Sequence, residues 1–213
     1  MQFCDRTQPM KIFVTGISTE VGKTVASAIL VEALEADYWK PVQAGDLHHS
    51  DSDKVKELIS NSKSVIHPNS YALKTPMSPH AAAEIDGTEI DLQCIVEPKT
   101  DNHLVIEGAG GLLVPLNNKD TIFDLIKPEY KVVVVSRHYL GSINHSLLTI
   151  NALQQQGFKV GIVFSGDEHS TSESIILEKT KATLLGRIDE EENFNKKVVK
   201  KYANRFKQKL KLF

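Results

Sequence analysis

The chain has 213 residues, 41% of them hydrophobic and 24% charged, with a formal net charge of -2. This length and composition predict one globular domain over residues 1–213, and the balanced charge gives no reason to expect nucleic acid or a membrane as a partner. Two distant cysteines, Cys4 and Cys94, are typical of reduced thiols, and no N-terminal stretch is apolar enough for a signal peptide. We therefore expect a cytoplasmic protein that acts on small molecules.

Four short β-branched runs, each bounded by polar residues or glycine, predict buried parallel strands. They lie at residues 12–14, 104–106, 132–135 and 160–164. Between them, apolar residues at helical spacing predict helices over 24–36 and 142–156. Strands that alternate with helices predict an α/β fold, with a doubly wound, mostly parallel sheet and helices on both faces.

Two other segments carry different patterns. Prolines interrupt residues 46–101, so we expect helices and loops that lie over the sheet there. Near the C-terminal end, Val199, Tyr202, Phe206 and Leu210 recur at helical spacing among many lysines. An amphipathic helix that covers the core is the favoured interpretation, and a nucleic-acid or membrane patch is the alternative.

The strongest motif is a glycine-rich loop at residues 16–24, directly after the first strand and before the first long helix. Backbone N–H groups in such a loop, together with the positive end of the following helix, cradle phosphates. Lys23 is expected to neutralise phosphoryl charge, and the Thr24 hydroxyl to coordinate Mg2+. Five residues separate Gly16 from Gly22, one more than in the plain Walker A pattern, yet the context predicts a P-loop NTPase-like fold that binds a nucleotide.

Four further blocks follow this loop along the chain. They read Lys-Pro-Val-Gln-Ala-Gly at 40–45, Ser-Pro-His at 78–80, Val-Ile-Glu-Gly-Ala-Gly-Gly-Leu at 105–112 and Leu-Gly-Ser-Ile-Asn-His at 140–145. With these five blocks in this order, the chain resembles the dethiobiotin synthetase family from about residue 11 to residue 150.

The resemblance implies an ATP-dependent ligase that uses CO2 to close a cyclic urea on 7,8-diaminononanoate, giving dethiobiotin in biotin biosynthesis. A carbamate forms on one amine, ATP phosphorylates it, and the second amine attacks the carbamic-phosphoric anhydride. Because every intermediate is anionic, such a site needs cations and N–H donors more than a strong base. The resemblance also implies Mg2+ as cofactor, ATP as substrate, and a homodimer with the substrate site at its interface.

At the matching positions, the resemblance implies roles for individual residues. Lys40, Lys23 and Thr19 are the expected catalytic residues, with Lys40 as the cation that contacts both carbamate and γ-phosphate. The expected nucleotide-binding residues are Glu20, Val21, Gly22, Lys23, Thr24, Val25, Asp53, Glu107, Gly108, Ala109 and Gly110. The expected substrate-binding residues are Lys40, Ala44, Gly111, Leu140, Gly141, Ser142, Ile143 and Asn144.

The expected ligands of Mg2+ are Thr24, Asp53 and Glu107. Glu107 ends a predicted core strand, at the edge of a parallel sheet where ligands gather. Asp51 and Asp53 both lie close to Ser50, and a helix cap is the competing interpretation for this segment. The resemblance assigns Asp53 to the metal and the preceding residues to the cap.

Some positions depart from the family pattern. Ala44 stands where the family has serine or threonine, which removes a hydroxyl contact with the substrate. Residues 164–167 lack the family's asparagine, and Asp189 replaces a proline, so the blocks that bind adenine are degenerate. We therefore expect relaxed base selectivity, with comparable use of ATP, GTP and CTP.

The alternative function is a ParA- or MinD-like ATPase that acts as a partitioning or regulatory switch. Such proteins carry a signature lysine early in the phosphate loop, where this chain has Ser18. The blocks that contain Lys40 and Glu107 also argue against a bare nucleotide-binding module.

Overall fold

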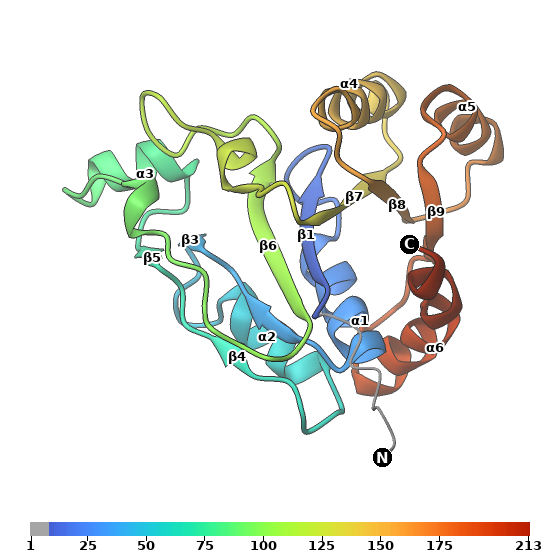
Figure 1. The fold of residues 1–213 in the computed structure, drawn as a ribbon, viewed down its shortest axis with the longest axis horizontal. Coiled ribbons are helices and arrows are strands. Elements are labelled where there is room, and N and C mark those ends of the chain that lie inside the picture. Colours follow the sequence, from blue (N-terminus) through green and yellow to red (C-terminus); the bar gives the residue numbers. More distant parts are fainter. Residues whose placement is uncertain (1–8) are drawn as a thin grey trace, which may run out of the picture.

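The computed structural model describes residues 9–213, so Cys4 lies outside the described part of the chain. Its core is a seven-stranded sheet in which every paired neighbour runs parallel (Figure 1). In spatial order the strands are β4 (Ile66–His67), β2 (Asp37–Trp39), β6 (Leu104–Gly111), β1 (Lys11–Gly16), β7 (Lys131–Arg137), β8 (Val160–Ser165) and β9 (Thr183–Ile188). The predicted α/β sheet is confirmed.

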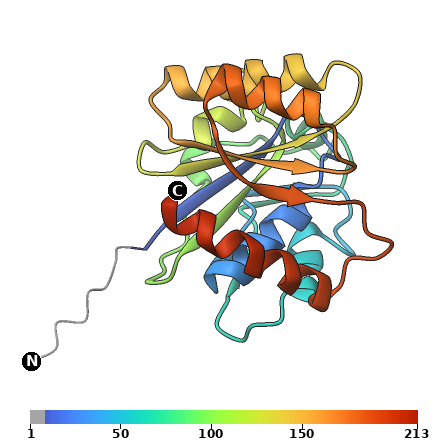
Figure 2. The same ribbon diagram turned by 90° about the vertical axis from the view of Figure 1, so that its right-hand side faces the viewer.

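Helices cover both faces of this sheet, as Figure 2 shows. On one face lie α1 (Lys23–Leu34), α2 (Asp51–Leu58) and α6 (Lys196–Leu212), and on the other lie α4 (Ser142–Gln155) and α5 (Ser170–Thr180). The predicted helices over 24–36 and 142–156 correspond to α1 and α4, each within one or two residues at its ends. Most of the apolar residues that predicted them are buried, among them Ile29 of α1 and Ile150 of α4, whereas Ile143 is exposed.

The proline-interrupted segment 46–101 contains two short strands that the sequence pattern did not predict. These are β4 and β5 (Tyr71–Leu73), and β5 pairs with β3 (Val42–Ala44) in a separate two-stranded sheet. The segment also contains α2, α3 (Pro79–Ile85) and the 3-10 turn η1 (Leu92–Cys94); a second such turn, η2 (Ile122–Leu125), follows β6. Strands of two or three residues are too short to show an alternating pattern.

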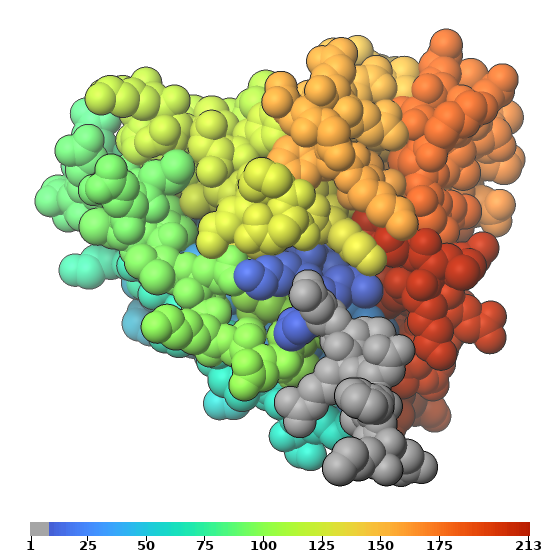
Figure 3. Space-filling view, in the orientation of Figure 1, coloured from blue at the N-terminus to red at the C-terminus, as the bar shows by residue number. Residues whose placement is uncertain are grey.

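The predicted C-terminal amphipathic helix is α6, and its apolar face is part of the core. Val199, Tyr202, Phe206 and Leu210 are all buried, and the helix packs on α1 and β9. A Cβ atom at Gly186 of β9 would lie only 2.2 Å from the ring of Phe206, so this close approach requires glycine. In Figure 3 this red segment forms one side of the molecule, and the cyan to green residues of the proline-interrupted segment form the opposite side.

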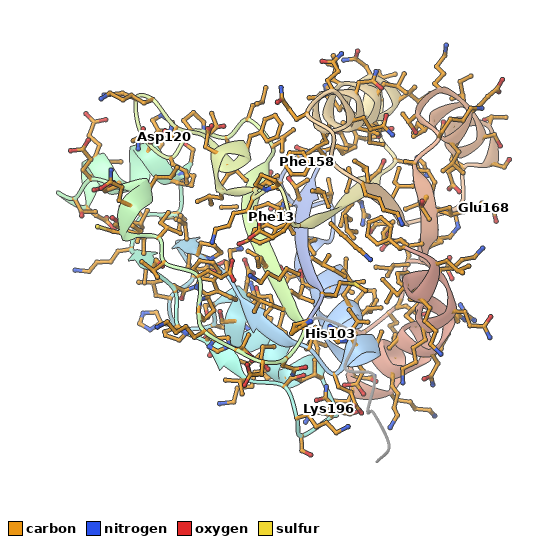
Figure 4. The ribbon with its side chains drawn as sticks, in the orientation of Figure 1. Phe13, His103, Asp120, Phe158, Glu168 and Lys196 are labelled. Atoms are coloured by element: carbon orange, nitrogen blue, oxygen red, sulfur yellow. The ribbon has the colours of Figure 1, made fainter. Side chains whose placement is uncertain are left out.

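The parallel arrangement brings distant motifs to one edge. Because β1, β6, β7, β8 and β9 run in the same direction, the loops that follow them gather at the carboxyl edge of the sheet. The buried ring of Phe13, in the middle of β1, lies near the centre of the molecule in Figure 4. Over residues 9–213, no helix has the length and apolar character needed to cross a membrane.

Candidate active site

The glycine-rich loop joins β1 to α1 in the strand–loop–helix arrangement of a P-loop. Gly22 has a left-handed backbone (φ 92°) and precedes α1 without any side-chain cap, so the first N–H groups of the helix face the loop. A Cβ atom at Gly16 would lie 2.8 Å from the carbonyl oxygen of Ser18, which keeps the loop compact. Lys23 donates a hydrogen bond to that same oxygen at 3.1 Å. The result is a ring of N–H donors with one ammonium group, suited to bind phosphate.

Glu107, on the neighbouring strand β6, is the acid that contacts the P-loop helix. Its carboxylate is buried, with 1% of the residue exposed. It accepts hydrogen bonds from Thr24 Oγ1 at 3.0 Å, from Tyr38 Oη at 3.0 Å and from Lys40 Nζ at 3.2 Å. The acid therefore ties the P-loop helix to β2 and to the residue that follows β2.

Lys40 lies between two carboxylates. Its ammonium group forms ion pairs with Glu107 and with Asp51 at the start of α2, and the side chain is almost fully buried. Burial alone would lower the pKa of Lys40, but the carboxylates of Glu107 and Asp51 outweigh this and raise the pKa above its ordinary value. Lys40 is therefore a cation at neutral pH and is not available as a general base.

Lys23 has a different electrostatic environment. Burial lowers the pKa of Lys23 to about 8, and although Glu107 opposes this effect, the positive charge of Lys40 adds to it. Nearby negative charge therefore compensates the burial of Lys23 only in part, whereas the carboxylates of Glu107 and Asp51 fully compensate the burial of Lys40. A bound phosphate would provide the missing charge.

The two aspartates near Ser50 have different surroundings in the structure. Asp51, and not Asp53, contacts Lys40 and lines the cavity in front of the P-loop. The carboxylate of Asp53 instead accepts from the backbone N–H of Ser50 at 2.9 Å and from its hydroxyl at 2.6 Å, in a capping box that begins α2. The carboxylate of Asp53, the expected metal ligand, is thus engaged in this cap, whereas the carboxylate of Asp51 lies in the cavity.

A cavity of about 700 Å³ connects these groups. The expected site residues that line it are Thr19, Glu20, Gly22, Lys23, Thr24, Val25, Lys40, Ala44, Glu107, Ala109 and Gly110. Asp51, Gln43 and Lys54 also line it and were absent from the expected set. Gly45 has a left-handed backbone, and a Cβ atom there would lie 2.6 Å from Pro76, so the 40–45 block packs against the residues just before the 78–80 block.

The expected substrate residues at 140–144 lie elsewhere at this edge. They form the start of α4, where Leu140 is fully exposed, Gly141 is left-handed and Ser142 is buried. Next to them is an apolar groove of about 450 Å³ that includes Gly111, Leu148 and His145. Within residues 9–213, Val21, Gly108 and the 140–144 segment do not line the larger cavity.

Tyr38 is a further residue of the site that the motifs did not indicate. It lies on β2 with its ring fully buried, and its hydroxyl donates to Glu107. Burial and the neighbouring Glu107 carboxylate raise the pKa of Tyr38 far above its usual value, which keeps the hydroxyl protonated as a donor. A tyrosine in a short β run predicts a buried core residue. Its role as a hydrogen-bond donor to Glu107 could be recognised only once the buried acid beside it was known.

Comparison with known proteins gives consistent results along almost the whole chain. Residues 10–198 match the family described as an AAA domain. The chain is 60% identical to the ATP-dependent dethiobiotin synthetase BioD of Christiangramia forsetii, over 95% of this chain and 98% of that protein. It is 52% identical to the protein of the same name from Cytophaga hutchinsonii, over 91% of this chain and 95% of that one.

Solved structures with a similar fold are more distant in sequence. A plasmid partition protein from Borrelia burgdorferi is 16% identical with a TM-score of 0.61, covering 97% of this chain and all of that chain. The MinC:MinD cell division complex of Aquifex aeolicus is 12% identical with a TM-score of 0.57, covering 96% of both chains. At these identities the likeness concerns the fold alone, and it does not favour the switch function over the enzyme.

The hydroxyl of Tyr38 provides a test of the Glu107 cluster. Tyr38→Phe should lower the free energy of unfolding by about 2 kcal/mol, because a fully buried charged acceptor loses a donor. It should also lower the catalytic rate constant about tenfold, because Glu107 loses its fixed orientation. Urea denaturation and steady-state kinetics measure the two effects.

Tyr130→Phe is the matched control, since the Tyr130 hydroxyl also bonds a glutamate, Glu97, away from the cavity. It should lose stability by about 1 kcal/mol and keep its rate constant. Equal kinetic effects in the two variants would contradict the orienting role of Tyr38.

Proposed function

The chain belongs to the ATP-dependent dethiobiotin synthetase family, and we propose that it closes the cyclic urea of dethiobiotin from 7,8-diaminononanoate, CO2 and ATP. The observation that supports this most strongly is the 60% identity to a dethiobiotin synthetase over nearly the full length of both chains. It is thus a ligase of biotin biosynthesis that uses ATP through its P-loop. The need for ATP also favours the cytoplasm as its place of action.

The proposed reaction has three steps, which the site residues serve by charge. One amine of the diamine adds to the carbon of CO2 and loses a proton, which gives a carbamate. A carbamate oxygen then attacks the γ-phosphorus of ATP, and ADP leaves. The second amine then attacks the carbonyl carbon of the mixed anhydride and loses a proton. The bond between this carbon and the phosphate oxygen breaks, and inorganic phosphate leaves.

Lys40 and Lys23 are the two cations of this scheme. Lys40, held as a cation by Glu107 and Asp51, is proposed to balance the negative charge of the carbamate and of the transferred phosphoryl group. Lys23 and the N–H groups of the loop hold the β- and γ-phosphates, with Thr19 beside them at the mouth of the cavity. Neither lysine needs to remove a proton, because the positive charge is what the transition state requires.

The donor set in the cavity fits Mg2+. Thr24 Oγ1 and the carboxylates of Glu107 and Asp51 are hard oxygen groups, and in this structure the ammonium of Lys40 bridges the two carboxylates as a cation would. We propose Thr24, Asp51 and Glu107 as the residues that hold Mg2+. The bound ion would neutralise charge on the β- and γ-phosphates.

A homodimer is proposed from the apolar groove beside the cavity. Leu113 and Leu148 line the groove, and 67% and 62% of these residues are exposed to solvent. Exposed leucines that gather in one apolar groove are typical of a surface that a partner covers. Thr19 and Val114 line both the groove and the large cavity, so a second copy seated there would reach the substrate. The exposed start of α4 at 140–144 would then offer N–H groups to the carboxylate of the diamine.

The reaction itself is tested with the purified protein, diaminononanoate, bicarbonate and MgATP. Mass spectrometry should detect dethiobiotin, together with ADP and phosphate in equal amounts. Lys40→Ala should lower turnover by at least about a hundredfold, because a buried cation at the transition state is removed. Phosphate release without dethiobiotin would instead favour the ATPase switch.

The assignment of Mg2+ ligands is tested by a matched pair of aspartates two positions apart. Asp51→Asn should raise the Mg2+ concentration for half-maximal turnover at least about tenfold, because a ligand charge is lost. Asp53→Asn should leave this concentration within about twofold of the original, because its carboxylate only caps α2. Titration of turnover with MgCl2 measures both, and the reverse pattern would restore Asp53 as the ligand.

The dimer is tested by placing a charge in the groove. Leu148→Glu should yield a monomer in size-exclusion chromatography with light scattering, and should raise the KM for the diamine, because burying an unpaired carboxylate is costly. Val65→Glu, at a residue 51% exposed between α2 and β4, is the control and should leave mass and KM unchanged. A Leu148→Glu protein of unaltered mass and KM would rule out this interface.

A further inference from the structure

The turn between β7 and α4 carries a largely buried histidine that the proposed chemistry does not use. This turn comprises residues 138–141, and its last residue, Gly141, precedes α4 with a left-handed backbone. Tyr139 and Leu140 are exposed, whereas the side chain of His138 is only 13% exposed. The imidazole of His138 is therefore the group of this turn that reaches inward.

His138 lies against β8 and α5. Its ring stacks on the ring of Phe164 of β8, with 5.5 Å between the two ring centroids. Its Nε2 atom lies 2.9 Å from Oε1 of Glu173, in the first turn of α5. Because a carboxylate offers only acceptors, Nε2 carries the hydrogen and donates it to Glu173. The turn that leads into α4 is thus bonded to α5, which lies beside α4 in Figure 1.

Glu173 is held in place by two further groups. Arg187 of β9 forms an ion pair with its Oε2 atom, and the backbone N–H of His169 donates to Oε1 at 3.3 Å. Burial alone would raise the pKa of Glu173, but hydrogen bonds from Arg187 and His138 lower this pKa below its ordinary value. The carboxylate is therefore ionised at neutral pH, and it joins β9, the start of α5 and the turn before α4.

Two further hydrogen bonds of the turn are local. The hydroxyl of Tyr139 forms a hydrogen bond with Nδ1 of His145 at 2.8 Å, and the N–H of Ser142 donates to the carbonyl of Tyr139 at 2.9 Å. Both partners lie at the start of α4 itself. These bonds keep the shape of the turn but do not attach it to the rest of the protein, whereas the bond between His138 and Glu173 does.

We propose that Glu173 is a positioning residue for the diamine, which acts through His138 to fix the start of α4. The N–H groups in the first turn of a helix have no partner within the helix, and those of α4 are the groups proposed to bind the carboxylate of the diamine. A displacement of about 1 Å is enough to lose such contacts, so the turn has to be held from outside α4. The inference rests on the proposed function, and it adds a residue of α5 that lies outside every sequence block that predicted the site.

Two variants remove the contact and keep the size of the side chains. His138→Phe retains a ring against Phe164 and loses the donor, and Glu173→Gln loses the charge of the acceptor. Isothermal titration calorimetry measures the Kd of 7,8-diaminononanoate and, separately, that of MgATP. Each variant should bind the diamine about tenfold more weakly than the wild type, the effect of one charge-assisted hydrogen bond. The Kd of MgATP should stay within about twofold, because the P-loop keeps its own contacts.

The double variant shows whether the two residues act through one contact. His138→Phe combined with Glu173→Gln should weaken diamine binding no further than the weaker-binding single variant, whereas independent effects would multiply to about a hundredfold. Glu178→Gln, at an exposed residue of the same helix, is the matched control and should keep the wild-type Kd. Multiplied effects, or a loss of MgATP affinity equal to the loss of diamine affinity, overturn the proposal.

Hydrogen exchange followed by mass spectrometry reports on the turn without any substrate. Both variants should exchange the amides of residues 138–146 faster than the wild type, with those of residues 16–30 unchanged. Unchanged exchange at 138–146 overturns the positioning role.

None of these measurements requires ring closure. A wild-type protein that binds the diamine but forms no dethiobiotin would refute the proposed reaction and leave the positioning role in place. Dethiobiotin synthesis with unaltered diamine affinity in both variants would do the reverse, and a wild-type protein that binds no diamine would overturn both.

Discussion

The buried carboxylate of Glu107 is the interaction on which this site depends. It accepts hydrogen bonds from Thr24 of α1, from Tyr38 of β2 and from Lys40, which directly follows β2, so the P-loop helix and β2 converge on one group. A buried negative charge is tolerated only with such partners, and removing any of them would leave the others poorly satisfied. The position of the phosphate loop relative to Lys40 is therefore set by this acid as much as by the sheet.

The same acid explains why two lysines in one cavity behave differently. Lys40 has two carboxylates within reach and stays charged, whereas Lys23 is buried with less compensation and its pKa falls to about 8. The protein therefore supplies more negative charge around Lys40 than around Lys23. The negative charge of a bound triphosphate would compensate the buried ammonium group of Lys23. Nucleotide binding would thus also stabilise the charged form of this lysine.

Much of the fold and of the phosphate site could be predicted from the sequence, because periodic strands, a glycine-rich loop and ordered blocks are local signals. Lys23, Thr24, Lys40 and Glu107 lie together as the motifs predicted. The roles of the two aspartates after Ser50 were harder to predict, because a helix cap and a metal ligand both require a carboxylate at the start of a helix. Only the direction of α2 separates Asp51, which faces Lys40, from Asp53 in the cap. The role of Tyr38 depends on Glu107, which is distant in sequence, and no local pattern encodes this contact.

The packing of α6 on α1 has a consequence for how the protein is made. The helix that begins at the phosphate loop is the first helix of the chain, and its outer face is covered by the last one. On the ribosome, β1 and α1 emerge early and cannot complete their packing until β6, β7 and finally α6 have been synthesised. Until then the apolar residues of β1 and α1 stay exposed to solvent, and exposed apolar surface of this kind favours aggregation.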